Sequence, residues 1–317
     1  MTMNQDTSLA IETEYAIGEE KKGQGPDWQN LKGDEHFQQQ KQRADGASKQ
    51  AAAKFYRMMQ EIGDEMQEAT NALSLSNGSR NELQILDLCM APGGYTASAL
   101  KYNPTAKAFG ITLHPEQGGH QVLFNSPRST VLYHDITMFA TEFGVDQVPL
   151  THPEHDSFSS ETPFLNQRFD LASAMASRLT VSQLILALQR IRPGGTLIML
   201  LHKIEAFDIV ELLYIFSQIS EIQAFKPAKK HAIRSSFYLI AKNIQPDSKA
   251  AKLAIVAWKK AWWNTTFAGE GAGALRKEID EESVQNVINA FGDKLAALAG
   301  PVWKIHAEAL SKTDFVH

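Results

Sequence analysis

Apolar residues recur at helical spacing in the first clearly patterned segment of the chain, residues 48–71. Steps of three and four residues place five side chains on one helical face: Phe55, Met58, Met59, Ile62 and Met66. The preceding residues, 1–45, are rich in Gln, Glu, Lys, Gly and Asp. This composition predicts a loosely ordered arm, followed by one amphipathic helix.

From residue 83 onward, short apolar runs alternate with amphipathic stretches. This alternation is typical of an α/β fold with a mostly parallel sheet. The expected strands are 85–88, 108–111, 130–133, 169–173 and 196–201, with a closing pair at 222–226 and 236–242. Thr180 with Gln183, and Asp208 with Glu211, predict capping boxes at the start of two helices. The polar residues 145–167 predict an inserted surface loop.

The last part of the chain is predicted to be helical. One helix carries Trp258, Trp262 and Trp263, and a second runs from about Glu281 to a stop at Gly300-Pro301. We therefore expect three parts: an arm (1–45), a central α/β domain (46–245) and a C-terminal helical extension (246–317).

Composition narrows the class of protein. The 317 residues are 43% hydrophobic and carry a net charge of −5, which indicates a soluble globular protein. The single cysteine, Cys89, excludes an internal disulfide and favours an intracellular protein, cytoplasmic or nuclear. The polar start predicts no signal peptide, and the apolar run 197–201 is too short to span a membrane. His152, His155 and Asp156 are too sparse for a zinc site, so we expect no metal.

The most informative motif is the strand and turn at residues 85–96. The turn Pro92-Gly93-Gly94 follows an apolar strand and precedes a helix. Glycines let a backbone approach a ligand closely, and ligands of open α/β sheets bind beyond the carboxyl ends of the strands. The turn lacks the spacing of dinucleotide-binding and nucleoside-triphosphate-binding loops, so those ligands are disfavoured.

The stretch from Asp87 to Tyr95 resembles the S-adenosylmethionine loop of FtsJ-like (RrmJ-type) ribose 2′-O-methyltransferases, D-L-x-x-A-P-G-G followed by an aromatic residue. Residues 108–113 and 134–137 resemble the G-F-G-M-T-L and G-D-I-T stretches of the eukaryotic cap-methylating branch. Arg192-Pro193-Gly194-Gly195 and the pair Lys226-Pro227 before Tyr238 are also similar to the family pattern. The resemblance implies a Rossmann-like class I methyltransferase sheet of seven strands, with S-adenosyl-L-methionine as cofactor.

The resemblance also implies which residues bind the cofactor. They are Asp87, Cys89, Ala91, Pro92, Gly93, Gly94, Tyr95, Thr112, Leu113, Asp135, Ile136 and Ser173. The two glycines and Tyr95 would shape the pocket for the methionine part, Asp87 would lie near its amino group, and Asp135 would accept from the adenine amine. The alternative for Asp87 and Asp135 is a local role in capping loops. Cys89 is expected to be a small packing residue.

The family catalyses methyl transfer with a Lys-Asp-Lys-Glu tetrad, and this chain matches little of it. By spacing, the Asp falls on Ala174, the second Lys on Leu200 and the Glu on Ser236, while Lys54, with Arg57 as rival, matches the first Lys. His202 and Lys203 follow the lost second Lys closely and are the replacement candidates, with His202 as a possible general base.

Two basic segments are candidates for the acceptor surface. Lys226, Lys229, Lys230 and Arg234 form the densest cluster, which either binds substrate phosphate or is a solvated loop. The three tryptophans near Lys259 and Lys260 either stack on bases or form a packing face, and we favour packing. The expected function is methyl transfer to an oxygen, either of an RNA ribose or of a small hydroxylated metabolite. The alternative is a catalytically degenerate module that binds the cofactor, RNA or a protein partner.

Overall fold

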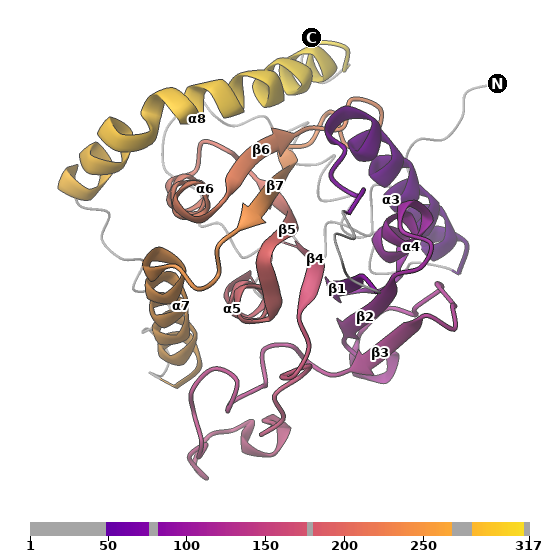
Figure 1. Cartoon of the computed structure of the whole chain (residues 1–317), viewed down its shortest axis with the longest axis vertical. Helices are drawn as coiled ribbons and strands as arrows, with labels where there is room; N and C mark the ends of the chain where they lie inside the picture. Colours follow the sequence, from indigo (N-terminus) through magenta and orange to yellow (C-terminus); the bar gives the residue numbers. More distant parts are fainter. Residues whose placement is uncertain (1–48, 76–81, 176–179, 268–280, 314–317) are drawn as a thin grey trace.

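The computed structural model describes residues 49–75, 82–175, 180–267 and 281–313, so the predicted arm lies outside the described residues. A seven-stranded sheet with the order β3-β2-β1-β4-β5-β7-β6 forms its centre (Figure 1). The strands are β1 Gln84–Leu88, β2 Lys107–Thr112, β3 Ser129–Tyr133, β4 Phe169–Met175, β5 Ile191–His202, β6 Glu221–Phe225 and β7 Ser236–Ile244. Strands β1 to β5 pair in parallel, and β7 runs antiparallel to both β5 and β6. The predicted α/β fold with a mostly parallel sheet is confirmed.

Helices cover both faces of the sheet, which explains why its inner strands are continuously apolar. On one face lie α3 (Lys49–Thr70) and α4 (Gly94–Tyr102). On the other face lie α5 (Thr180–Arg190) and α6 (Phe207–Ile219), with α7 (Lys249–Phe267) and α8 (Glu281–Leu310) packed beside them (Figure 1). No helix in the described part of the chain is both long and apolar enough to cross a bilayer.

Helix α3 has the amphipathic character predicted from the sequence. All five residues of its predicted apolar stripe are buried in the core beside α4 and the sheet. This helix matters for the site because it contacts the turn after β1.

One predicted helix cap and two helix boundaries differ from the predictions. The Gln183 side chain accepts a hydrogen bond from the backbone N–H of Met175, 2.7 Å away, so it fastens β4 to α5 instead of completing a capping box. Helix α6 begins one residue before Asp208, and its N-cap is Ala206, with no side-chain bond. Helix α8 continues through Pro301 to Leu310, because the packing of Ala299 and Val302 in the core holds the helix across the proline.

The segment between β3 and β4 is an insertion that is anchored in the core. The buried carboxylate of Glu142 pairs with the guanidinium of Arg190 on α5, and Arg190 Nε also donates to the carbonyl of Pro163 over 2.9 Å. The ring of His152 forms a 3.0 Å hydrogen bond with the carbonyl of Thr266 on α7. His152 is therefore a structural contact, and the described residues contain no group of three or more His, Cys, Asp or Glu side chains suited to a metal.

Candidate functional site

The turn after β1 is held by main-chain contacts with β2. The backbone N–H groups of Cys89 and Met90 both donate to the carbonyl of Ile111, over 2.9 and 3.0 Å. Cys89 has a positive φ of 75°, and Gly93, the N-cap of α4, has a φ of 97°. The second of these positions needs glycine, because a side chain is strained in this backbone region.

Close packing also requires glycine at both positions of the turn. A Cβ on Gly94 would lie 2.5 Å from Cβ of Met59 on α3, and one on Gly93 would lie 2.6 Å from Cβ of Phe124. The segment that carries Phe124 is tied to the turn, because the N–H of Leu123 donates to the carbonyl of Pro92 over 2.9 Å. The turn is thus enclosed between α3 and the connection from β2 to β3.

Asp87 lies beneath this turn. Its carboxylate accepts hydrogen bonds from the hydroxyl of Thr96 on α4 and from the side chain of Ser173 on β4. Burial raises the pKa of Asp87, although these hydrogen bonds oppose the shift. The carboxylate therefore joins β1, β4 and α4, which is the local structural role that the sequence left open as the alternative.

A cavity of about 170 Å³ opens at the carboxyl ends of β1, β2 and β3. Five of the predicted cofactor residues line it: Cys89, Thr112, Leu113, Asp135 and Ile136. The remaining lining residues include Gly118, Gly119, His120 and His134, which the sequence reasoning did not assign to the cofactor. The pair Gly118-Gly119 was the available signal, since two glycines after a strand mark a turn at the same edge of the sheet.

Two of the ionisable groups that line this cavity are Asp135 and Cys89. Asp135 Oδ1 accepts from the backbone N–H of Thr137 at 2.8 Å and from its hydroxyl at 2.7 Å, so the loop is capped locally while the carboxylate faces the cavity. Burial, together with the charges of Asp87 and Asp135, raises the pKa of Cys89 to about 12. Cys89 is thus a neutral wall of the cavity at ordinary pH.

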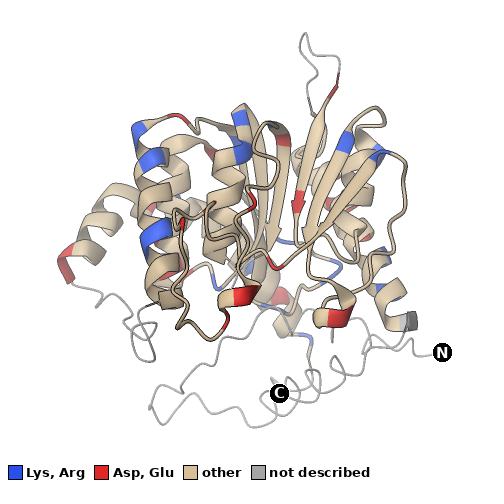
Figure 2. Ribbon diagram, turned by 90° about the horizontal axis from the view of Figure 1, so that it is seen from below, with Lys and Arg blue, Asp and Glu red and all other residues tan. Residues whose placement is uncertain are grey.

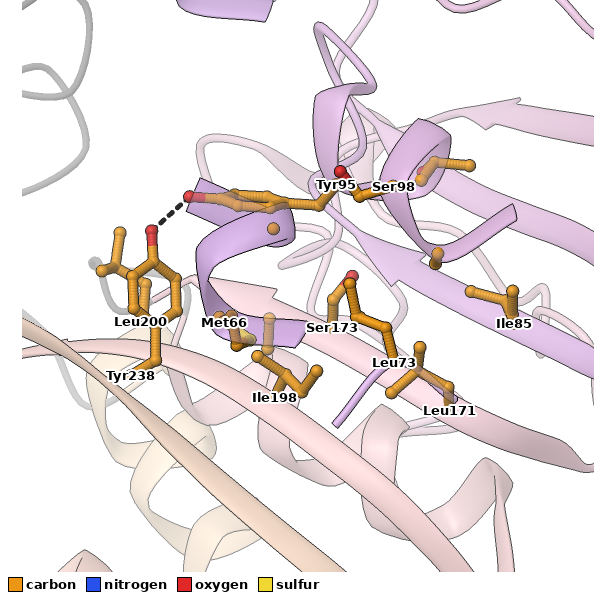
Figure 3. Close-up of a pocket in the computed structure, with 14 residues that line it drawn as sticks. Met66, Leu73, Ile85, Tyr95, Ser98, Leu171, Ser173, Ile198, Leu200 and Tyr238 are labelled. Carbon is orange, nitrogen blue, oxygen red and sulfur yellow. Dashed lines mark hydrogen bonds between the residues drawn. The ribbon is translucent and has the colours of Figure 1, made fainter. Parts of the chain in front are cut away.

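A second, smaller cavity of about 30 Å³ lies between the sheet and helices α3 and α4 (Figure 3). Its walls are mostly apolar and include Leu200, Ile198 and Met66. The hydroxyls of Tyr95 and Tyr238 are hydrogen-bonded to each other at one end of the cavity (Figure 3). Of the predicted cofactor residues, Tyr95 and Ser173 line this cavity, while Ala91, Pro92, Gly93 and Gly94 are buried in the turn itself.

Two positions of the family tetrad, Ala174 and Leu200, line the second cavity. Leu200 pairs with Met175 on β4 and with Tyr238 on β7, and all three belong to the core on the α3 side. Ala174 belongs to the core on the opposite face. Met175 is the β4 residue that pairs with Leu200 in the ladder, whereas Ala174 is the one that lines the cavity with Leu200. Neither side chain can act as a carboxylate.

The three catalytic candidates occupy separate places. His202 is half-buried and pairs with Ser236 across β5 and β7, two residues beyond Leu200 and on the same face. Lys203 is exposed, with a positive φ of 53°. Lys54 is exposed on α3. None of the three lines either cavity.

The predicted basic cluster does not form one exposed patch. The ammonium of Lys226 is buried and donates to the carbonyls of His231 and Ser236, each at 2.7 Å, and to that of Arg234. Arg234 is buried as well, and Lys230 pairs with Glu61 on α3 at 3.0 Å. Only Lys229 is exposed without a described ion pair, so most of this cluster supports the turn between β6 and β7.

The strand order, the antiparallel β7 and the glycine turn after β1 define a Rossmann-like class I methyltransferase fold. Residues 50–244 match the FtsJ-like methyltransferase family, so the chain belongs to this family, whose cofactor is S-adenosyl-L-methionine.

A curated relative is the AdoMet-dependent rRNA methyltransferase SPB1 of Mycosarcoma maydis, 23% identical over 202 residues. The match covers 62% of this chain but only 21% of that protein, so the chain spans about a fifth of the relative's length. Among solved structures, an rRNA methylase from Streptococcus thermophilus is 12% identical with a TM-score of 0.36, covering 58% of this chain and 97% of the other. Human methyltransferase-like protein 13, in complex with SAH, is 13% identical with a TM-score of 0.38, covering 71% and 99%.

Proposed function

We propose that this chain binds S-adenosyl-L-methionine at the carboxyl ends of β1, β2 and β3 and transfers a methyl group to a hydroxyl oxygen of RNA. The observation that carries the proposal is the 170 Å³ cavity, because it gathers Cys89, Thr112, Leu113, Asp135 and Ile136 from three separate segments. The name of the SPB1 relative supports RNA over a small metabolite as acceptor.

The chemistry of the lining fits the nucleoside part of the cofactor. Asp135 offers a carboxylate acceptor for the adenine amine, and the apolar side chains of Leu113 and Ile136 offer contacts for the ring. Thr112 offers a hydroxyl for the ribose at the end of β2. The methionine part would lie by the turn at Gly93. When bound, the cofactor supplies an electrophilic methyl group.

The acceptor hydroxyl must lose its proton during transfer, and His202 is the proposed base. It is the titratable candidate nearest to Leu200 on the same face of β5. Lys203 and Lys54 are proposed to contribute positive charge around the acceptor. Alignment of the oxygen with the methyl carbon could supply much of the rate, because positioning alone removes several kcal/mol, about 7–11, from a bimolecular barrier.

One observation favours a second function, a module that binds the cofactor without methyl transfer. Ala174 and Leu200 line the tetrad region, and the Tyr95–Tyr238 hydrogen bond lies at the end of a mostly apolar cavity there. An apolar lining cannot orient a lysine or accept a proton. In this second function the cavity still binds the cofactor, but no methyl group is transferred.

Calorimetric titration with S-adenosylmethionine and S-adenosylhomocysteine tests the shared part of both functions. We expect binding that Asp135→Ala weakens at least tenfold and that Asp146→Ala, on the exposed insertion, leaves unchanged. No heat for either ligand would contradict both functions.

Transfer of a radiolabelled methyl group to total RNA, with a metabolite extract as the comparison, then separates the two functions. If the chain is an enzyme, we expect label in RNA. We also expect the His202→Ala variant to transfer methyl groups more slowly and its rate no longer to fall on the acidic side of the pH profile. His155→Ala is the control for removal of an imidazole. Cofactor binding without label in any acceptor would establish the second function.

A further inference from the structure

Two of the three tryptophans of helix α7 lie on its inner face and pack against the rest of the protein. Trp262 is buried against Phe143, with ring centroids 4.8 Å apart, and Trp258 stacks on Phe216 of α6. These two rings form the packing face that the sequence favoured. Trp263 lies outside this face and remains 48% exposed.

The outer face of α7 combines lysines with large apolar side chains. Lys252, Val256, Lys260 and Trp263 follow at steps of four, four and three residues, and Leu253 lies next to Lys252; all five are exposed. Leu253 and Val256 are 59% and 65% exposed. Eleven residues separate the first and last members, which is about 16 Å along a helix. We call these five residues the α7 stripe.

The charge of α7 differs from that of the whole chain. The helix contains four lysines and no acidic residue, in a chain of net charge −5. Figure 2 shows these lysines as blue bands on the left side of the molecule. No described carboxylate forms an ion pair with Lys252 or Lys260. The stripe therefore offers two cations and one exposed indole to an anionic partner.

Near its C-terminal end, helix α7 is hydrogen-bonded to the loop that lines the proposed cofactor cavity. Trp262 Nε1 donates to the carbonyl of Thr137 over 3.0 Å, and the N–H of Thr137 donates to Asp135, which lines the cavity. Trp263 follows Trp262 directly in the helix. A chain that lies along the stripe therefore reaches the end of α7 that is bonded to the loop of the proposed cofactor cavity.

We infer that the α7 stripe binds single-stranded RNA, with phosphates at Lys252 and Lys260 and an unpaired base on Trp263. Alternating cations and an aromatic platform are what a flexible polyanion with stackable bases requires. The stripe also replaces the predicted patch, because Lys226 and Arg234 are buried and Lys230 is paired with Glu61. The inference rests on the proposed function in taking RNA as the acceptor.

Fluorescence anisotropy with a labelled 12-nucleotide single-stranded RNA of mixed sequence tests the inference on the full chain. Lys252→Ala/Lys260→Ala is expected to weaken binding and to reduce the slope of log K against log salt by about 1.4, since each phosphate contact contributes about 0.7 for single strands. Trp263→Ala is expected to weaken binding about tenfold. Helix α8 supplies matched controls in the exposed residues Lys294, Lys304 and Trp303, which are each changed to alanine.

The inference is supported if the stripe variants lose affinity while the α8 controls and the circular dichroism spectra stay unchanged. It is overturned if RNA binding is absent, if the stripe and control variants weaken equally, or if vesicles of anionic phospholipid bind the stripe and RNA does not. Calorimetry with S-adenosylmethionine on the same variants keeps the outcomes apart. If the unmutated chain does not bind the cofactor, the proposed function is refuted. If the chain binds the cofactor but the stripe variants bind RNA as well as the unmutated chain does, only this inference is refuted.

Discussion

Replacing Lys226 by methionine is expected to destabilise the fold strongly without acting through RNA. The ammonium is buried and donates to three carbonyls, those of His231, Arg234 and Ser236. Methionine keeps the volume of the side chain but leaves the three buried acceptors without their donor, at a cost of about 1–3 kcal/mol each. The lower limit for all three gives about 3 kcal/mol, or roughly a 150-fold change in the unfolding equilibrium.

Urea unfolding followed by tryptophan fluorescence measures this effect. Lys229→Met is the matched control, because Lys229 is exposed only three residues away and its loss is expected to change stability by less than about 0.5 kcal/mol. The reasoning is refuted if the two variants unfold at the same urea concentration. A Lys226→Met variant with normal stability and reduced RNA affinity would instead restore the original interpretation of Lys226 as a substrate contact.

Three further predictions concern the core and the cofactor turn. Glu142→Gln is expected to lower the free energy of unfolding in urea by about 3–5 kcal/mol, because it leaves the buried Arg190 guanidinium without a counter-charge. A second substitution, Arg190→Met in the same chain, should recover much of this loss. An unaltered urea midpoint for Glu142→Gln would contradict the argument. Cys89, with a pKa of about 12, is expected to resist Ellman's reagent at pH 8 in the folded protein and to react at once in urea, and rapid reaction of the native protein would disprove the protonated thiol. Gly94→Ala is expected to lower the melting temperature, because the added Cβ has no space. Gly300→Ala in α8 is expected to raise stability by up to about 1 kcal/mol, because an added Cβ there would meet no neighbouring side chain or loop within 4 Å. The opposite order of the two variants would refute the packing argument.

The sequence predicted the sheet well because its strands depend on local patterns. The strands follow from alternating apolar runs, and Thr112 and Asp135 come at or shortly after strand ends, where a parallel sheet places its ligand. Burial of a charged side chain has no such local signal. Lys226 looks like part of a surface cluster along the chain, and only the folding of β6 against β7 places carbonyls around its ammonium.

The tetrad region shows the same limit in another form. Spacing placed the missing carboxylate at Ala174, which lines the second cavity together with Leu200, while the pairing of β4 with β5 sets Met175 opposite Leu200. A shift of one residue changes the face in a strand, so the length of the β4 motif alone could not decide it. A small shift along the chain also made the capping interpretation of Asp208 wrong. Helix α6 already begins at Phe207, so Asp208 lies inside its first turn and Ala206 is the N-cap.

We propose that cofactor binding and methyl transfer depend on different residues in this chain, so that the two can be separated by experiment. The cofactor cavity is built by the ends of β1, β2 and β3, with main-chain bonds from Cys89 and Met90 to Ile111. None of these contacts involves Leu200 or Ser236 on β5 and β7. Apolar replacement of the tetrad thus leaves the cofactor cavity intact, so tight binding of S-adenosylmethionine cannot establish catalysis. Catalysis would be established by methyl transfer that is lost in the His202→Ala variant.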